Sequence, residues 1–155
     1  MEIEILQDKK RSLYVYKNNE LSFYSKVKFN WANRITKIYN HDNILLLEVE
    51  YKMTLINSHY KILFQNELVK ENIVEITDTR IVFDTNERLY TKQGYFIAIN
   101  GNFSYYFKEI RVSQLKQKNW VSNPKILLNI NDENLEFLNL IIFHILATGA
   151  GYSSD

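Results

Sequence analysis

The chain has 155 residues, of which 46% are hydrophobic and 24% are charged, a composition typical of one soluble globular domain. It contains no cysteine, which excludes a disulfide framework, a thiolate zinc site and a cysteine nucleophile. The 11 Tyr and 9 Phe residues stand beside only 4 Gly and 1 Pro, and aromatic residues favour the pleated, half-buried surface of β-strands.

The net charge of +1 is unevenly distributed along the chain. Residues 9–40 hold eight basic residues against the single acid Glu20, which leaves a local charge of +7. We predict that most of them form a site for an anionic surface, with a solvated strand face as the alternative interpretation. The predicted site residues are Lys9, Lys10, Arg11, Lys26, Lys28, Arg34 and Lys37.

The first ten residues, MEIEILQDKK, alternate acidic and apolar side chains. This order lacks the basic segment followed by an apolar segment that marks a secretory signal. We therefore expect a cytoplasmic protein, or one that is peripheral at the membrane.

Alternation of apolar and polar residues, the pattern of half-buried strands, recurs along most of the chain. The alternating runs are 13–15, 26–30, 44–53, 60–64, 81–83, 95–99, 103–107, 110–112 and 126–130. Polar turn signals separate these runs, and Asn100-Gly101 is the clearest hairpin because Asn-Gly accepts the positive φ of a type I′ turn. Roughly ten short strands at this spacing predict a β-barrel or a β-sandwich in one domain, residues 1–155.

The last part of the chain predicts a helix over about 132–148, with Asn131 or Asp132 as its cap and glycines at its end. Its apolar residues surround the helix axis, so no polar face remains, and such a helix is buried. The predicted core residues are Leu138, Ile141, Ile142 and Ile145.

A buried helix after a series of strands lies inside a barrel, crosses a membrane or packs on a partner. The apolar stretch is shorter than the ~20 residues of a membrane span, so we expect a protein that does not span the membrane. The sequence thus predicts a mainly β fold, a closed antiparallel β-barrel enclosing a buried hydrophobic C-terminal α-helix. A β-sandwich with a packed C-terminal helix is the alternative.

Signals for catalysis are weak. The three histidines, His41, His59 and His144, are scattered, so we expect no metal, and no motif indicates another cofactor. His144 is expected to be a neutral core histidine held by a hydrogen bond. Asp78 and Asp84 flank one strand and are the only pair that suggests a glycosidase, so we expect no enzyme and keep a small hydrolase as a minor alternative.

Several aromatic residues lie near basic ones, namely Tyr14, Tyr16, Tyr24, Trp31, Tyr106 and Trp120. Such residues stack on nucleic-acid bases, rest at a lipid headgroup layer or form protein interfaces. The near-neutral net charge argues against nucleic acid, so we expect a protein partner or anionic phospholipid.

Residues 35–46, ITKIYNHDNILL, form a strand, a polar turn and a strand, and YKMTLINSHYKILFQNEL continues as paired strands. With the C-terminal hydrophobic helix, this order resembles the tubby C-terminal-like superfamily, which includes tubby proteins, LURP-one-related proteins and phospholipid scramblases. The resemblance implies a roughly twelve-stranded antiparallel barrel around a central helix. The phosphoinositide-binding Lys/Arg pair of tubby proteins and the scramblase calcium segment have no counterpart here, so no specific ligand is implied.

Together these observations predict a non-enzymatic binding module that uses its barrel exterior to bind a protein partner or an anionic lipid surface. The abundance of Lys, Asn, Ile and Tyr suggests a bacterial source. An antitoxin-like immunity protein that neutralises a toxin is therefore the alternative function.

Overall fold

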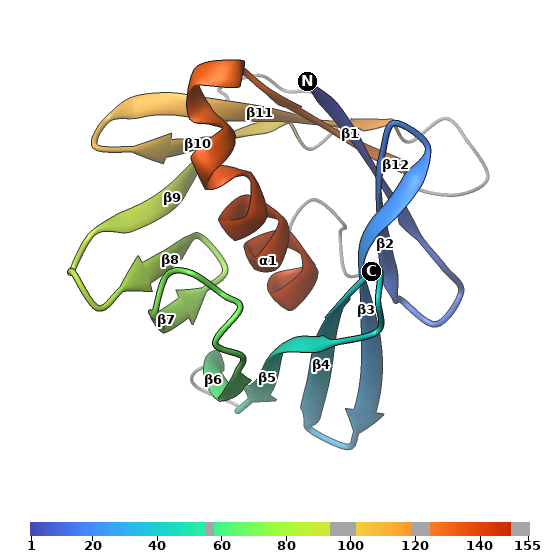
Figure 1. The fold of residues 1–155 in the computed structure, drawn as a ribbon. Helices are drawn as coiled ribbons and strands as arrows, with labels where there is room; N and C mark the ends of the chain where they lie inside the picture. The colour runs from blue at the N-terminus through green and yellow to red at the C-terminus, as the bar shows by residue number, and fades with distance from the viewer. Residues whose placement is uncertain (55–57, 94–101, 119–124, 150–155) are drawn as a thin grey trace.

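The computed structural model describes residues 1–54, 58–93, 102–118 and 125–149, and in it a nearly closed antiparallel β-barrel surrounds one helix (Figure 1). The described strands are β1 (Glu2–Gln7), β2 (Leu13–Lys17), β3 (Glu20–Asn30), β4 (Asn33–Asn40), β5 (Leu45–Met53), β6 (Ser58–Gln65), β7 (Ile73–Thr77), β8 (Arg80–Phe83), β9 (Arg88–Gln93), β10 (Phe103–Phe107), β11 (Ile110–Lys118) and β12 (Lys125–Ile130). The predicted fold class is thereby confirmed, and the sandwich alternative is not adopted. The predicted strand 95–99 and the Asn100-Gly101 hairpin lie outside the described residues.

The sheet follows the order β6-β5-β4-β3-β2-β1-β12-β11-β10-β9-β8-β7, and each ladder is antiparallel. Pairing of β1 with β12 joins the N-terminal and C-terminal halves of the barrel. Because successive strands run in opposite directions, their connections alternate between the two ends of the barrel. The β1–β2 and β3–β4 turns share the end at which the helix terminates, and we call it the helix-exit end.

Strand β5 shows why these residues form a half-buried sheet. Leu47 and Val49 are buried, whereas Glu48 and Glu50 between and after them remain on the outer face. The alternation predicted Leu45 for the inner face, but a register shift between Ile38 and Tyr39 of β4 brings Leu46 into the core instead. A bulge adds one residue to one strand and so changes which side chain faces inward.

The C-terminal helical segment has two parts. Asp132–Phe137 is a 3-10 helix, η1, and Leu138–Thr148 is the α-helix α1. The predicted helix over about 132–148 is present, but its first part is a 3-10 helix, where Asn131 makes no side-chain capping bond and a tighter backbone bond from Asn134 to Asn131 forms. Gly149 ends α1 as expected, with φ 70 and its N–H donating to the Ile145 carbonyl at 2.8 Å.

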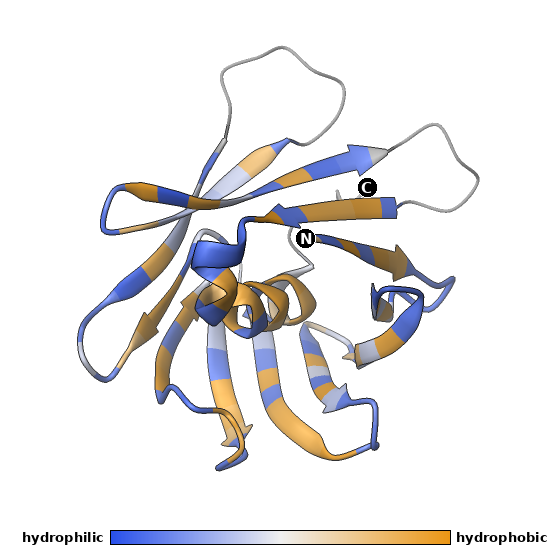
Figure 2. Cartoon of the chain, turned by 45° about the horizontal axis from the view of Figure 1, so that its top comes forward, coloured by the Kyte–Doolittle hydropathy of each residue, from blue (hydrophilic) through white to orange (hydrophobic). Residues whose placement is uncertain are grey.

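Helix α1 lies inside the barrel and is mostly in the colour of hydrophobic residues in Figure 2. Every residue from Leu140 to Ala147 is buried, as is Leu138, so the predicted core residues Leu138, Ile141, Ile142 and Ile145 all lie inside. Asn139 is the exposed exception near the start of the helix. Within the described residues, no helix is long and apolar enough to cross a membrane.

Candidate functional site

The first basic cluster lies on the turn between β1 and β2, and one carboxylate organises this turn. Oδ1 of Asp8 accepts the backbone N–H groups of Lys10 and Ser12 at 2.8 and 2.9 Å. Aspartate side chains stabilise tight turns in this way. The negative charge of Asp8 is thus engaged within the turn, while Lys9, Lys10 and Arg11 are exposed to solvent.

The second basic cluster lies on the outer face of β3 and β4. Lys26 and Lys37 are direct cross-strand partners, and Lys28 follows two residues further along β3 on the same face. The Lys26 Nζ lies 5.2 Å from the ring centroid of Tyr39, and Lys37 pairs with Glu48 at 3.6 Å. Lys26 and Lys28 form no ion pair with any residue that the structure describes.

One residue of the first cluster reaches the strand that carries the second. The guanidinium carbon of Arg11 is 5.7 Å from the ring centroid of Phe29, which follows Lys28 at the end of β3. A hydrogen bond of 2.9 Å from the Leu13 N–H to the Ser25 Oγ joins the strands behind this contact. The structure therefore brings together residues that are distant in sequence. We name this surface the basic end, and it comprises Lys9, Lys10, Arg11, Lys26 and Lys28.

Arg34 is half-buried and contacts the end of α1. Its Nη2 donates to the carbonyl oxygens of Ala147 and Thr148 at 3.3 and 3.4 Å, and its guanidinium carbon lies 5.0 Å from the Tyr51 ring centroid. Basic side chains at a helix C-terminus interact favourably with the helix dipole. The role of Arg34 in an anionic-surface site stays a prediction, and we define the basic end without it because its guanidinium binds the end of α1.

An apolar cluster borders the basic end. Phe29 is 53% exposed, Met53 is 62% exposed and Trp31, on the turn between β3 and β4, is fully exposed. The Met53 N–H donates to the Ala32 carbonyl at 3.1 Å, which places the end of β5 beside that turn. We name Phe29, Trp31 and Met53 the apolar rim.

Two of the aromatic residues named from the sequence, Tyr14 and Tyr24, form a tyrosine row with Tyr39 on the outer face of β2, β3 and β4. The Tyr14 and Tyr24 rings stack with centroids 6.2 Å apart, and Tyr24 and Tyr39 stack at 5.1 Å. Tyr24 is only 8% exposed as a result. Because the rings cover one another, the row offers few faces on which bases could stack. Trp120 lies outside the described residues.

The buried His144 is hydrogen-bonded at both ring nitrogens. Nε2 donates to the Thr77 carbonyl at 2.8 Å, so Nδ1 accepts the Tyr105 hydroxyl at 2.6 Å. Burial lowers the pKa of His144 to about 4, although the Thr77 carbonyl and the charge of Asp78 act in the opposite direction. The imidazole is thus neutral near pH 7, and this group joins α1 to β10 and to the end of β7.

Asp78 and Asp84 do not form the glycosidase pair considered from the sequence. Asp78 and Asp84 stand beyond opposite ends of β8, which separates them by roughly 15–20 Å of extended chain. Paired glycosidase carboxylates lie about 5–9.5 Å apart. Among the described residues, no three His, Asp or Glu side chains gather in a way that could hold a metal ion.

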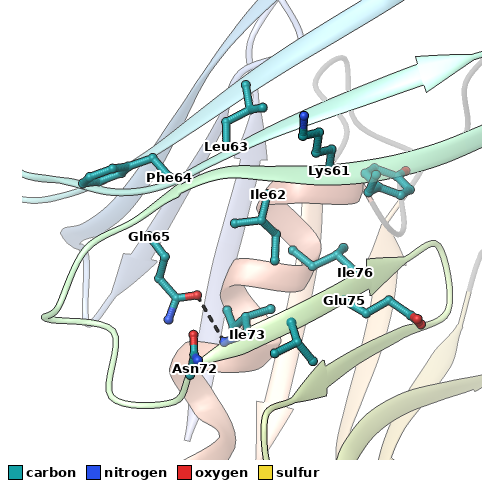
Figure 3. Close-up of a pocket in the computed structure, with 11 residues that line it drawn as sticks. Lys61, Ile62, Leu63, Phe64, Gln65, Asn72, Ile73, Glu75 and Ile76 are labelled. Carbon is teal, nitrogen blue, oxygen red and sulfur yellow. Dashed lines mark hydrogen bonds between the residues drawn. The ribbon is translucent and has the colours of Figure 1, made fainter.

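The barrel closes where β6 faces β7. These two strands form no ladder with each other, and side-chain hydrogen bonds link this region. Gln65 Nε2 donates to the Glu71 carbonyl at 2.8 Å, and its Oε1 accepts the Ile73 N–H at 3.1 Å (Figure 3). At the other end the Tyr60 hydroxyl donates to Asp78 at 2.6 Å. Between them lies a hollow of about 530 Å³, lined by residues 60–65 and 72–76. We call this region the seam.

Both edges of the seam carry a bulge. The registers skip Leu63 in β6 and Val74 in β7, and these side chains are 43% and 53% exposed. Bulges protect sheet edges against pairing with another chain. A thirteenth strand inserted between β6 and β7 would have to run parallel to one of them, because β6 and β7 run antiparallel to each other. The seam is therefore a poor template for strand addition.

Comparisons with known proteins found no relatives. No known protein family, no curated protein and no solved structure matches this chain. The barrel around a helix is accordingly established by the structure of the chain itself, and membership of the tubby-like superfamily stays a hypothesis.

Proposed function

We propose that this protein is a non-catalytic binding module that docks on anionic phospholipid through the basic end. One observation carries the proposal. The β1–β2 turn and strand β3, which the contact between Arg11 and Phe29 links, carry five cations, and four of them, Lys9, Lys10, Lys26 and Lys28, form no ion pair with another described residue. A patch of one sign of charge attracts a surface of the opposite sign.

The acidic side chains close to the helix-exit end make their hydrogen bonds and ion pairs with groups other than the lysines of the basic end. Asp8 is bound within its own turn, and Asp78 accepts the Tyr60 hydroxyl. Glu50 pairs with Lys52 at 3.4 Å. The lysines of the basic end therefore face solvent without a neutralising partner among these acids.

The expected affinity for an anionic membrane follows from the number of cations in the basic end. Each Lys or Arg near an anionic membrane contributes about 1 kcal/mol, so five contribute about 5 kcal/mol. This corresponds to a dissociation constant of roughly tenths of a millimolar, which is weak and reversible. Binding by charge alone is also screened by salt, because the Debye length falls to about 3 Å at 1 M.

Vesicle co-sedimentation tests the proposal. The protein should bind vesicles of phosphatidylcholine with phosphatidylserine at low salt and leave them at high salt. The triple variant Lys9→Glu, Lys10→Glu, Lys28→Glu should lose most of this binding. Equal binding to phosphatidylcholine alone, or no binding to either vesicle, would refute the proposal.

A matched control keeps the total charge change constant. Lys17, Lys70 and Lys108 lie at the end of the barrel opposite the helix-exit end, on or beside the β2–β3, β6–β7 and β10–β11 connections. Replacing all three with Glu should reduce vesicle binding much less than the first triple variant. If both triples lose binding equally, net charge and not the basic end is responsible.

A protein partner is the second candidate, as in the antitoxin-like alternative, and exposed apolar side chains at the seam favour it. Phe64 is 41% exposed, next to Leu63 and across from Val74. Apolar side chains that gather on a surface often mark protein interfaces. A partner captured by the wild type and by the lysine triple variant, but lost with Phe64→Asp, would support this function. Capture that Phe64→Asp leaves unchanged would refute it.

A further inference from the structure

The turn between β3 and β4 contains a residue that neither backbone geometry nor packing explains. Trp31 and Ala32 form a two-residue turn, and Trp31 has φ 50. Positive φ at the first turn position is characteristic of type II′ hairpins, where Gly is preferred. A bulky side chain in this conformation is strained. Trp31 is nevertheless fully exposed, so its side chain returns little packing energy to the fold.

Trp31 is not an isolated exposed aromatic residue. Phe29 and Met53 are each more than half exposed beside it, and together they form the apolar rim. The hairpin that carries Trp31 lies at the lowest point of the barrel in Figure 1. Two large apolar side chains on this hairpin and a third at the neighbouring end of β5 are left uncovered by the barrel, so they are available to enter another surface.

The charges next to the rim indicate which surface this is. Arg11 lies over the Phe29 ring, and Lys28 precedes Phe29 in the chain. Cations beside exposed Trp and Phe residues match an anionic membrane, where Trp rests at the headgroup layer and Lys or Arg contact the phosphates. This charge complementarity favours anionic lipid over a neutral or basic protein surface.

We propose that the apolar rim is a wedge that inserts into the interfacial layer of an anionic membrane. This inference rests on the proposed function and adds the depth and orientation of binding. Insertion of the β3–β4 hairpin turns the helix-exit end of the barrel toward the lipid, with the lysines of the basic end at the headgroup level. The wedge adds an apolar contribution to the free energy of membrane binding, beyond the contribution of the charges.

Tryptophan fluorescence tests insertion directly. The sequence has 2 Trp, so Trp120→Phe leaves Trp31 as the single reporter. With vesicles of phosphatidylcholine and phosphatidylserine, the Trp31 emission should shift to the blue. Lipids brominated near the headgroup should quench it more than lipids brominated near the chain ends.

A second reporter serves as the control. Leu68, which is 59% exposed in the β6–β7 connection, lies at the opposite end of the barrel. In the Trp31→Phe, Trp120→Phe background, Leu68→Trp should show neither the shift nor the quenching. Equal quenching of both reporters would overturn the proposed orientation.

Substitution of Trp31 separates insertion from folding. Trp31→Gly should weaken vesicle binding by about tenfold, because one partly inserted aromatic side chain is lost. It should keep or raise the urea midpoint, since Gly suits the turn. Anionic vesicles that bind without any change in Trp31 emission would overturn insertion while the proposed function stands. No binding to those vesicles would overturn both.

Discussion

The hydroxyl of Tyr105 donates a hydrogen bond of 2.6 Å to Nδ1 of His144, and both side chains are completely buried. Their rings meet edge to face with centroids 5.5 Å apart. The pair of hydrogen bonds made by His144 fixes the tautomer of the imidazole. The Thr77 carbonyl can only accept, so Nε2 holds the proton and Nδ1 accepts the Tyr105 hydroxyl. This arrangement involves both ring nitrogens. It also ties the inner helix to two strands through one polar group.

We expect the stability of the protein to fall in mild acid because of His144. Its folded pKa of about 4 lies below the ordinary value of 6.5, so the unfolded chain binds the proton first. The associated stability, roughly 3 kcal/mol, is complete above pH 6.5 and is lost as the pH falls toward 4. Urea unfolding at several pH values measures this. His144→Gln should flatten the slope between pH 6.5 and 4.5, and an unchanged slope would contradict the assignment.

Removing the partner of His144 should be costly at neutral pH. Tyr105→Phe leaves Nδ1 buried without a donor, which destabilises a fold by about 1–3 kcal/mol. Tyr106→Phe is the matched control because Tyr106 is the next residue of β10, only half-buried and on the other face. Chemical denaturation should separate the two variants clearly. Similar midpoints for both would show that the buried bond contributes little.

Arg34 should matter for stability and not for lipid binding. Arg34→Met removes the bonds to the Ala147 and Thr148 carbonyls, and we expect a loss of about 1–2 kcal/mol. Lys37→Met removes an exposed ion pair and should change stability by less than about 1 kcal/mol. Thermal denaturation and vesicle co-sedimentation should be measured on both variants. Loss of vesicle binding by folded Arg34→Met would return Arg34 to the binding surface.

The seam should open first when its side-chain bridge is removed. Gln65→Ala deletes the acceptor of the Ile73 N–H, so hydrogen exchange at Ile73 should accelerate. Gln114→Ala is the control, because β11 is paired on both sides. Exchange measured by mass spectrometry on peptides covering β6 and β7 should change only in the first variant. Unchanged exchange there would mean that packing alone closes the barrel.

A charge in the centre of the helix should abolish soluble folding. Ile141 is fully buried, and an isolated carboxylate there would lack a partner. Asn139→Asp, on the exposed side of the same helix, should be tolerated. Expression in the soluble fraction and cooperative melting distinguish the outcomes. A soluble, cooperatively melting Ile141→Asp protein would contradict the buried position of α1.

Local patterns predicted some elements and missed others for identifiable reasons. The alternation at 44–53 predicted β5 because its outer and inner residues differ strongly in polarity. Strand β7 escaped prediction because the bulge at Val74 interrupts its alternation, and β9 escaped because Leu89 is its only buried residue among those with described side chains. The 3-10 start of the helical segment was missed because its polar residues suit either kind of helix.

The sequence by itself determined that an apolar helix without a polar face is buried by strands, because burial of apolar surface requires no knowledge of which strands cover it. Only the tertiary structure decided which cations meet. Strand register and closure are set by contacts between residues far apart in sequence, and each bulge changes which side chain faces outward. For that reason Arg34 lies at the end of α1, whereas Arg11 lies over Phe29.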